Sequence, residues 1–126
     1  MCKSFNKGVL YVRIHDGEVA DFFYPDEEVP AGYSNFHCQH IARIHWEAGE
    51  PSFGGWVDTS QNGDRSGSGM LIEFRKATDA DIKKLLDAWK SRVSIAEWVE
   101  NVQEYNPDLS KAEKDRIARI TKPYIK

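Results

Sequence analysis

The sequence predicts an α+β fold in which an N-terminal antiparallel β-meander of four to five strands is followed by three short C-terminal helices that pack on the sheet. Two observations predict it. Apolar and polar residues alternate with period two over much of residues 1–75, whereas apolar residues in 76–126 recur with the period of a helix. Turn pairs that contain glycine separate the predicted strands of the first part, and helix-capping residues precede the predicted helices of the second. The 126 residues fit a single α+β domain, because one hydrophobic core typically serves about 100–150 residues.

The first element is a predicted β-hairpin over residues 9–24. Asp16-Gly17 separates the strand-like runs 9–15 and 18–24, and this pair favours a type I′ turn, which needs positive φ at both central positions. In that register His15 pairs with Glu18, Arg13 with Ala20 and Tyr11 with Phe22. Alternation along the two strands then places one group of side chains in the core: Leu10, Val12, Ile14, Val19 and Phe23.

The other face of this hairpin carries many aromatic side chains. Its residues are Val9, Tyr11, Arg13, Ala20, Phe22 and Tyr24. An exposed apolar patch of this kind typically marks an interface, and tyrosine and arginine are common in binding hot spots. We expect this face to be covered either by a partner, such as a second copy in a homodimer, or by another layer of the same chain.

Further strands are expected before residue 76. Residues 35–47 alternate apart from a break near His40, which favours one long strand with a bulge there over a helix. A short strand at 52–58 and another at 70–75 flank a glycine- and serine-rich turn or loop over residues 59–69.

Residues 76–126 are expected to form three helices of about three turns each. Thr78 is the predicted N-cap of the first helix, and Ser94 and Ser110 open capping boxes at the second and third. Behind the first two caps, apolar residues follow the spacing i, i+3, i+4 and i+7. At least one of these stripes, which contain Trp89 and Trp98, is expected to cover a face of the sheet.

The chain is mildly acidic, which argues against some partners. Its 17 Lys and Arg and 20 Asp and Glu residues give a formal net charge of −3, whereas binding to duplex DNA usually needs clustered basic residues. Residues 1–75 hold 6 basic and 11 acidic residues, a net −5, and residues 76–126 hold 11 and 9, a net +2. The acidic loop 25–32 lies in the acidic part, so we expect a partner protein with a basic surface and no nucleic acid.

The sequence also favours a cytoplasmic location without a membrane. No run approaches the roughly 18 apolar residues of a membrane span, and no apolar stretch of a secretory signal follows the first residues. The two cysteines, Cys2 and Cys38, do not make a disulfide framework, which suits a reducing compartment.

Histidines are concentrated in one segment, which raises the question of metal binding or catalysis. His37, His40 and His45 lie within nine residues, but a strand would spread them over two faces and about 26 Å. We therefore expect no metal site and no cofactor. A small hydrolase with a histidine general base (His15, His37 or His45) stays an alternative, although no Gly-x-Ser-x-Gly motif supports it.

The primary functional hypothesis is a small, non-enzymatic protein-binding module. Chains of this kind serve as inhibitors or adaptors, for example as virus-encoded blockers of a host defence enzyme, and this last step is an analogy. The hypothesis combines the aromatic hairpin face with the acidic loop. Its partner-binding residues are Tyr11, Arg13, Phe22, Tyr24, Asp26, Glu27 and Glu28.

A second hypothesis is a binding protein for a small phosphorylated or nucleotide ligand at the Gly/Ser-rich loop 62–69. Backbone amides of such a loop can hold phosphate, and an aromatic ring can stack on a base. The loop precedes a strand rather than a helix and matches neither common glycine pattern of phosphate sites. The residues expected to bind this ligand are Trp56, Arg65, Ser66 and Ser68.

Overall fold

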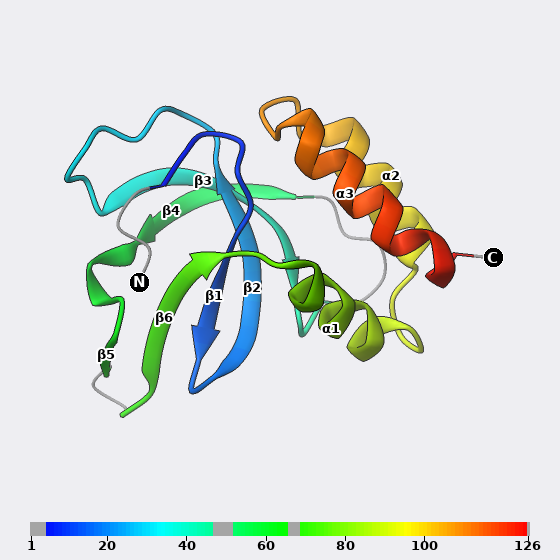
Figure 1. Cartoon of the computed structure of the whole chain (residues 1–126), viewed down its shortest axis with the longest axis horizontal. Coiled ribbons are helices and arrows are strands. Elements are labelled where there is room, and N and C mark those ends of the chain that lie inside the picture. Colours follow the sequence, from blue (N-terminus) through cyan, green and yellow to red (C-terminus); the bar gives the residue numbers. More distant parts are fainter. Residues whose placement is uncertain (1–4, 47–51, 66–68, 126) are drawn as a thin grey trace.

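The computed structural model describes residues 5–46, 52–65 and 69–125, and in these residues an antiparallel sheet is followed by three α-helices (Figure 1). The predicted α+β fold class is confirmed. The strands are β1 (Tyr11–His15), β2 (Glu18–Pro25), β3 (Asn35–Arg43), β4 (Phe53–Asp58), the two-residue β5 (Asp64–Arg65) and β6 (Leu71–Lys76), in the spatial order β4-β3-β2-β1-β6-β5. The helices are α1 (Asp79–Trp89), α2 (Ile95–Tyr105) and α3 (Lys111–Thr121), and the 3-10 helices are η1 (Thr59–Gln61) and η2 (Lys122–Tyr124).

The β1–β2 hairpin has the predicted turn but not the predicted register. Asp16 and Gly17 have φ angles of 50° and 81°, as a type I′ turn requires, and His15 pairs with Glu18. Beyond Val19 the register shifts by one residue, because Ala20 is an extra residue on β2. Arg13 therefore lies opposite Asp21, not opposite Ala20 as predicted.

Because of this bulge, the side chains of β2 after Ala20 point to the opposite sides of the sheet from those predicted. Tyr11 lies opposite Phe23 rather than the predicted Phe22, and the two pack together on the side of the sheet away from the helices. Phe22 and Tyr24 instead join the core beneath the helices. The predicted assignment of Phe22, Phe23 and Tyr24 was wrong for this reason, since one inserted residue inverts every later side chain on the strand.

A second bulge lies in β3, where the sequence predicts one. His40 pairs with Phe23 and Ala42 pairs with Phe22, which leaves Ile41 as the extra residue. The predicted strand with a bulge near His40 is confirmed, but it ends at Arg43 and does not continue to residue 47 as predicted. Side chains of β3 before the bulge alternate, so Cys38 and His40 face one side of the sheet while His37 and Gln39 face the helix side.

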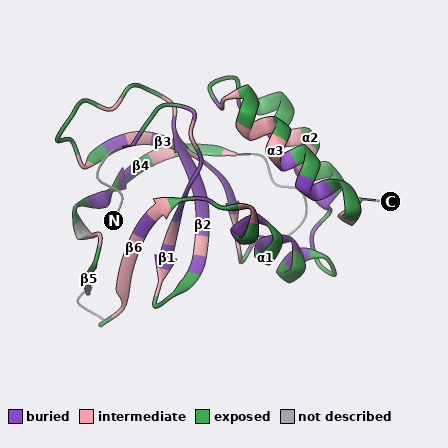
Figure 2. Cartoon of the chain, in the orientation of Figure 1, coloured by how far each residue is buried: buried purple, intermediate pink, exposed green. Residues whose placement is uncertain are grey.

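Hydrophobic clusters lie on both sides of the sheet, and Figure 2 shows that β1 and β2 are buried along most of their length. Trp89 and Trp98 anchor the helices in the larger cluster, with their rings edge to face at 5.2 Å. Their indole N–H groups donate to the backbone oxygens of Arg43 and Ile41 on β3. The smaller cluster on the other side is built by strand residues together with Phe5 and Val29, so the same chain covers both faces.

The three predicted N-caps are confirmed, but the reciprocal hydrogen bond of a capping box is shown at Thr78 and not at Ser110, where the Glu113 carboxylate accepts from the Leu10 amide instead. The Thr78 side chain accepts a hydrogen bond from the Asp81 amide, and the Asp81 carboxylate accepts one from the Thr78 amide. Ser94 and Ser110 accept hydrogen bonds from the amides of the residues three positions on. These caps start the helices at defined residues and thereby fix which stripe of each helix meets the sheet.

Candidate functional site

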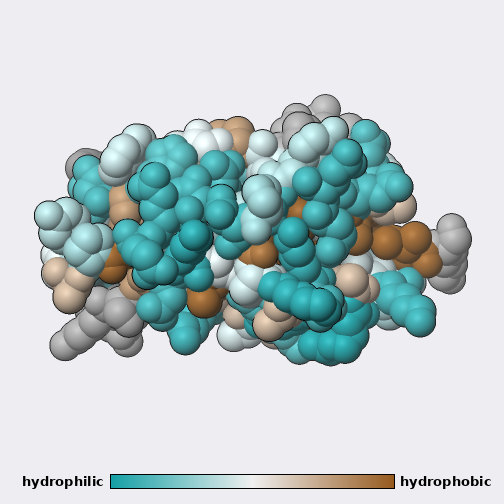
Figure 3. Space-filling model, turned by 90° about the horizontal axis from the view of Figure 1, so that it is seen from above, coloured by the Kyte–Doolittle hydropathy of each residue, from teal (hydrophilic) through white to brown (hydrophobic). Residues whose placement is uncertain are grey.

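The expected aromatic binding face is not exposed. Tyr11, Phe22 and Tyr24 are 0%, 1% and 1% exposed, because the bulge at Ala20 places the last two beneath the helices and because Phe5 packs against Tyr11. Of the two kinds of cover left open for this face, the structure shows cover by the same chain, so the argument for a homodimer at this face no longer holds. On the side of the molecule seen in Figure 3, hydrophilic residues predominate and hydrophobic ones lie scattered.

The structure places the remaining predicted site residues in different environments. Glu27 and Glu28 are exposed, as expected for the acidic loop, while Arg13 is bound to Asp21. Trp56 is 69% exposed. The backbone of Arg65 belongs to β5, and Ser66 and Ser68 lie outside the described residues. The phosphate-loop hypothesis therefore stays a prediction.

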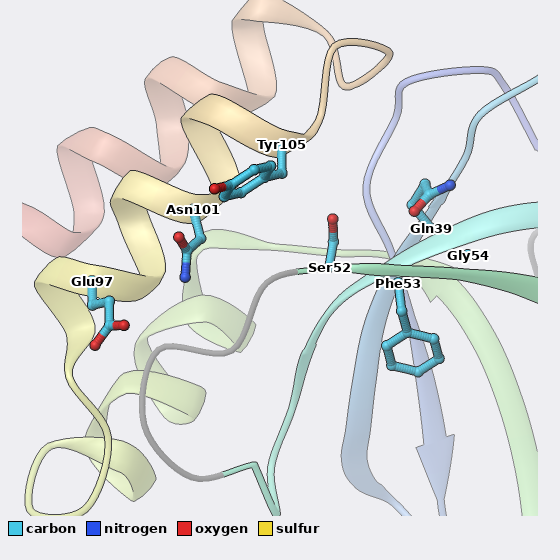
Figure 4. A pocket seen from close by; sticks show the side chains of 7 residues that line it. All are labelled: Gln39, Ser52, Phe53, Gly54, Glu97, Asn101 and Tyr105. Atoms are coloured by element: carbon cyan, nitrogen blue, oxygen red, sulfur yellow. The ribbon is translucent and has the colours of Figure 1, made fainter.

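A groove lies between α2 and the β3–β4 end of the sheet (Figure 4). Its volume is about 670 Å³. Asn101 and Tyr105 project into it from α2, and Gln39 and Ser52 lie on the sheet side, whereas the Phe53 ring points to the opposite face. The full lining is Gln39, Ser52, Phe53, Gly54, Glu97, Asn101 and Tyr105.

Gly54 keeps the floor of this groove open. A Cβ atom there would lie 3.1 Å from Gln39 Nε2 and 3.4 Å from His37 Cε1, which is tighter than ordinary van der Waals contact. The next residue, Gly55, likewise has no side chain, so two successive positions of β4 expose backbone. The pair weakens the strand by its conformational freedom, and glycine in a strand often marks close approach of another backbone.

Asp26, His37 and Gln39 form a polar cluster beside the groove, and Gln39 belongs to the groove lining. The His37 Nδ1–H donates to both oxygens of Asp26, at 2.7 and 2.8 Å, and the Gln39 amide donates to one of them at 2.7 Å. Burial would raise the pKa of Asp26, but these hydrogen bonds outweigh it and hold that pKa below its ordinary value. The carboxylate thus fixes the imidazole, and the second ring nitrogen, Nε2, lies close to Gly54.

Two exposed aromatic rings border this region. Trp56 meets His37 edge to face with ring centroids 5.6 Å apart, and Tyr105 on α2 is 56% exposed. Sequence reasoning named Trp56 only as a stacking residue for a nucleotide, and it missed Tyr105. The signal for Tyr105 was its place at the C-terminal end of a helix, outside the apolar stripe that contains Trp98 and Val102.

Strand β4 is at the edge of the sheet, with no described strand on its outer side. The Thr59 amide donates to the Ser34 oxygen at 2.6 Å, so these two residues form a hydrogen-bonded pair next to β3 and β4. In an antiparallel ladder, hydrogen-bonded pairs alternate with pairs whose amide and carbonyl groups point away from the partner strand. The amide and carbonyl groups of Gly54 and Trp56 therefore face away from β3.

The opposite face of the sheet holds an ionic cluster around the buried Asp21. Arg13, Asp21 and Arg43 are register partners on β1, β2 and β3, so they form one row across the sheet. Arg13 donates to Asp21 at 2.8 Å, and the Nδ1 atom of His40 lies 3.7 Å from the same carboxylate. Burial raises the pKa of Asp21 against the opposing influence of the two arginines.

Cys38, His40 and Asp21 have the order of a nucleophile, a base and an orienting acid. The Sγ atom of Cys38 lies 3.5 Å from Nε2 of His40. Burial, however, raises the pKa of the thiol to about 12 and lowers the pKa of His40 to about 4. Because a thiol with such a pKa stays protonated at neutral pH, this arrangement does not supply a nucleophile.

The histidines do not assemble into a metal centre in the described part of the chain. His37 and His40 face opposite sides of β3, and within 5–46, 52–65 and 69–125 no three potential ligands from His, Cys, Asp and Glu come together. None of the helices in the same ranges has the length and apolar character needed to cross a bilayer. Comparisons with protein-family models, with curated proteins and with solved structures found no match to this chain.

Proposed function

We propose that the chain is a non-enzymatic protein-binding module that takes up an extended, basic segment of a partner protein along the outer edge of β4. One observation carries the proposal: β4 is an edge strand with two successive glycines, and it lies beside a groove with exposed aromatic rings. Extended peptides bind such edges as an additional strand, in which backbone hydrogen bonds give affinity and alternate side chains give specificity.

The backbone geometry supports this mode of binding. The outward amide and carbonyl groups of Gly54 and Trp56 offer hydrogen bonds to an added strand. Natural proteins commonly protect exposed edges with charged side chains or proline. The central residues of β4 are instead Gly54, Gly55, Trp56 and Val57.

The side chains around β4 determine which residues an added strand would carry. Every second side chain of that strand would point toward the groove, where Tyr105 offers apolar surface and Glu97 offers a negative charge, with the exposed Trp56 further along β4. The exposed Glu27 and Glu28 follow Asp26, which accepts a hydrogen bond from Gln39 in the groove lining. Lysine or arginine at alternate positions, with apolar carbon chains and a charged end, would match both features.

A selection from random twelve-residue peptides tests the proposal. We expect the enriched peptides to carry basic residues at alternate positions and to shift the backbone NMR signals of residues 53–58. Trp56→Ala should weaken their binding about tenfold or more, since exposed tryptophans are typical hot spots. Tyr33→Ala is the matched control, because Tyr33 is 64% exposed but lies outside β4.

Backbone methylation separates strand addition from simple side-chain docking. Two versions of an enriched peptide can be made, with methyl groups on either the odd-numbered or the even-numbered amides. Because only every second amide of an added strand faces β4, one methylation register should abolish binding and the other should leave it nearly intact. Equal affinity in both registers would contradict strand addition. Failure to enrich any peptide, or unchanged binding to the Trp56→Ala variant, would contradict the site itself.

A second candidate function, the small hydrolase, is favoured by the Asp26–His37 pair alone. Asp26 orients the imidazole through Nδ1, which leaves Nε2 to accept a proton from a water molecule. If His37 is a general base, His37→Gln should slow hydrolysis of 4-nitrophenyl acetate by about 100-fold or more. His45→Gln, at an exposed histidine, should have no effect, and equal rates for both variants would eliminate this candidate.

A further inference from the structure

A second pocket lies on the sheet face that carries the Arg13–Asp21–Arg43 row. Its volume is about 290 Å³, and its lining includes Arg13, His15, Asp21, Arg43 and His45. The two bulges create this concentration of charge. If Ala20 and Ile41 were paired like ordinary strand residues, Arg13 would lie opposite Ala20 and Asp21 would lie opposite Ala42, and the row would not form.

Positive charge exceeds negative charge in this pocket. Two guanidinium groups share one carboxylate, so the cluster keeps one positive charge even with Asp21 ionised and both histidines neutral. Arg13 makes the close ion pair with Asp21, whereas the Nε atom of Arg43 lies 3.9 Å from the carboxylate, beyond hydrogen-bond distance. Arg43 also stacks over the Phe53 ring at 4.8 Å, which holds its side chain in place.

Several polar atoms of this cluster have no hydrogen-bond partner among the described residues. They include the Nε atoms of both arginines, which are donors, and the Oδ1 atom of Asp21, which is an acceptor. Asp21 is 1% exposed but belongs to the pocket lining, so a ligand in the pocket is the nearest source of a partner for its unpaired oxygen. Unpaired buried groups cost free energy, and a bound group that both accepts and donates would satisfy this set.

A protonated phosphate group has that combination. Its unprotonated oxygens accept hydrogen bonds from guanidinium groups, which bind tetrahedral oxyanions in a fork. Its P–OH group can donate to Asp21, which sulfate, as a fully deprotonated anion, cannot do. We propose that this pocket binds a phosphate group that retains a proton, either as inorganic phosphate or as the end of a small phosphate monoester, with Arg43 as the principal ligand and Asp21 as the acceptor that selects against sulfate.

Titration calorimetry at pH 6.5 and constant ionic strength tests the proposal, with inorganic phosphate, sulfate and glycerol 3-phosphate as separate ligands. We expect phosphate to bind at least about tenfold more tightly than sulfate, the effect of one charged hydrogen bond. Tighter binding of glycerol 3-phosphate would identify a monoester as the ligand, and tighter binding of phosphate would identify the free ion. Equal affinities for phosphate and sulfate would overturn the role of Asp21.

Charge-matched variants locate the site. Arg43→Gln should weaken phosphate binding at least about tenfold, whereas Arg119→Gln, which removes the same charge from an exposed position on α3, should change it less than twofold. Phosphate should also shift the NMR signals of residues 13–21 and 43–46 in the unaltered protein, a readout that does not depend on the fold of a variant. Equal binding by both variants, or shifts elsewhere, would overturn the proposal.

Discussion

Asp26 and Asp21 show how two carboxyl groups a few residues apart acquire opposite titration behaviour. Both lie at the sheet, on opposite faces. Burial dominates for Asp21 and raises its pKa, whereas hydrogen bonds from His37 and Gln39 prevail for Asp26 and lower its pKa. The sequence could not distinguish them, because Asp26 appeared as one of three loop acids and Asp21 as a polar residue within a strand. Their environments depend on strand register, which two bulges set.

Asp26→Asn is expected to lower the free energy of unfolding at pH 7 by about 1.5 kcal/mol, the lower end of the usual net worth of a hydrogen bond to a charged group. A carboxyl whose folded pKa is depressed stabilises the protein above its ordinary pKa of 3.8, and this contribution is lost as the pH falls through the folded pKa. Urea unfolding at pH 7 and pH 3 should show the gap between the two proteins narrowing. A gap that widens at pH 3 would contradict the hydrogen-bond assignment.

His40 should make stability depend on pH in a higher range. Its pKa falls from 6.5 to about 4 in the folded chain because burial disfavours the charged ring. The unfolded state therefore binds the proton first, and stability is lost as the pH falls from about 6.5 towards about 4. His40→Phe should remove roughly 1 kcal/mol of the loss between pH 6.5 and pH 5. If both proteins lose the same free energy of unfolding between these two pH values, the assignment to His40 is refuted.

At the scale of elements, helix starts and the hairpin turn were predictable, but strand register was not. Thr78, Ser94 and Ser110 act locally through hydrogen bonds to residues three positions on, and Asp16-Gly17 fixes its own turn. A bulge such as Ala20 leaves no comparable local signal, because an apolar residue fits either face of a strand. The exposed groove at β4 also escaped prediction, since it depends on where α2 lies.

Deletion of Ala20 should preserve the fold, because Ala20 is the extra residue of the bulge. Without it, Val19 and Asp21 become neighbours and stay opposite Ile14 and Arg13, so the residues after Asp21 keep the faces that they have now. We expect the deletion variant to retain a cooperative unfolding transition, followed by circular dichroism. Deletion of Ala31, which is exposed in a turn, is the control and should also preserve that transition. Loss of the transition in the Ala20 variant alone would contradict the assignment of Ala20 as the extra residue.

For the whole molecule, the important feature is that one chain covers both sides of its sheet. The sequence predicted helices on one side, and it left open whether a partner or the same chain would cover the other. Phe5 and Val29, from segments with no secondary structure of their own, complete the second cluster. Such cover arises from contacts distant in sequence, which no local pattern reports.

Phe5→Ala should therefore destabilise the molecule by about 3 kcal/mol, as expected for truncation of a buried phenylalanine. Phe5 is 6% exposed and packs against Tyr11 and Phe36. The control is Phe53→Ala, since Phe53 is 41% exposed and should cost less. Thermal and denaturant unfolding measure both changes. A larger loss for Phe53 than for Phe5 would mean that the N-terminal segment contributes little to stability.

The edge-to-face rings of Trp89 and Trp98 have a practical consequence for studying this chain. Two indoles 5.2 Å apart at 85° are close enough for their electronic transitions to couple, which gives a paired positive and negative band in the far-ultraviolet dichroism spectrum. The rings belong to different helices and touch only when both helices are seated on the sheet. The paired band is therefore an intrinsic optical signal of helix docking, and stopped-flow refolding experiments can follow it without an added label.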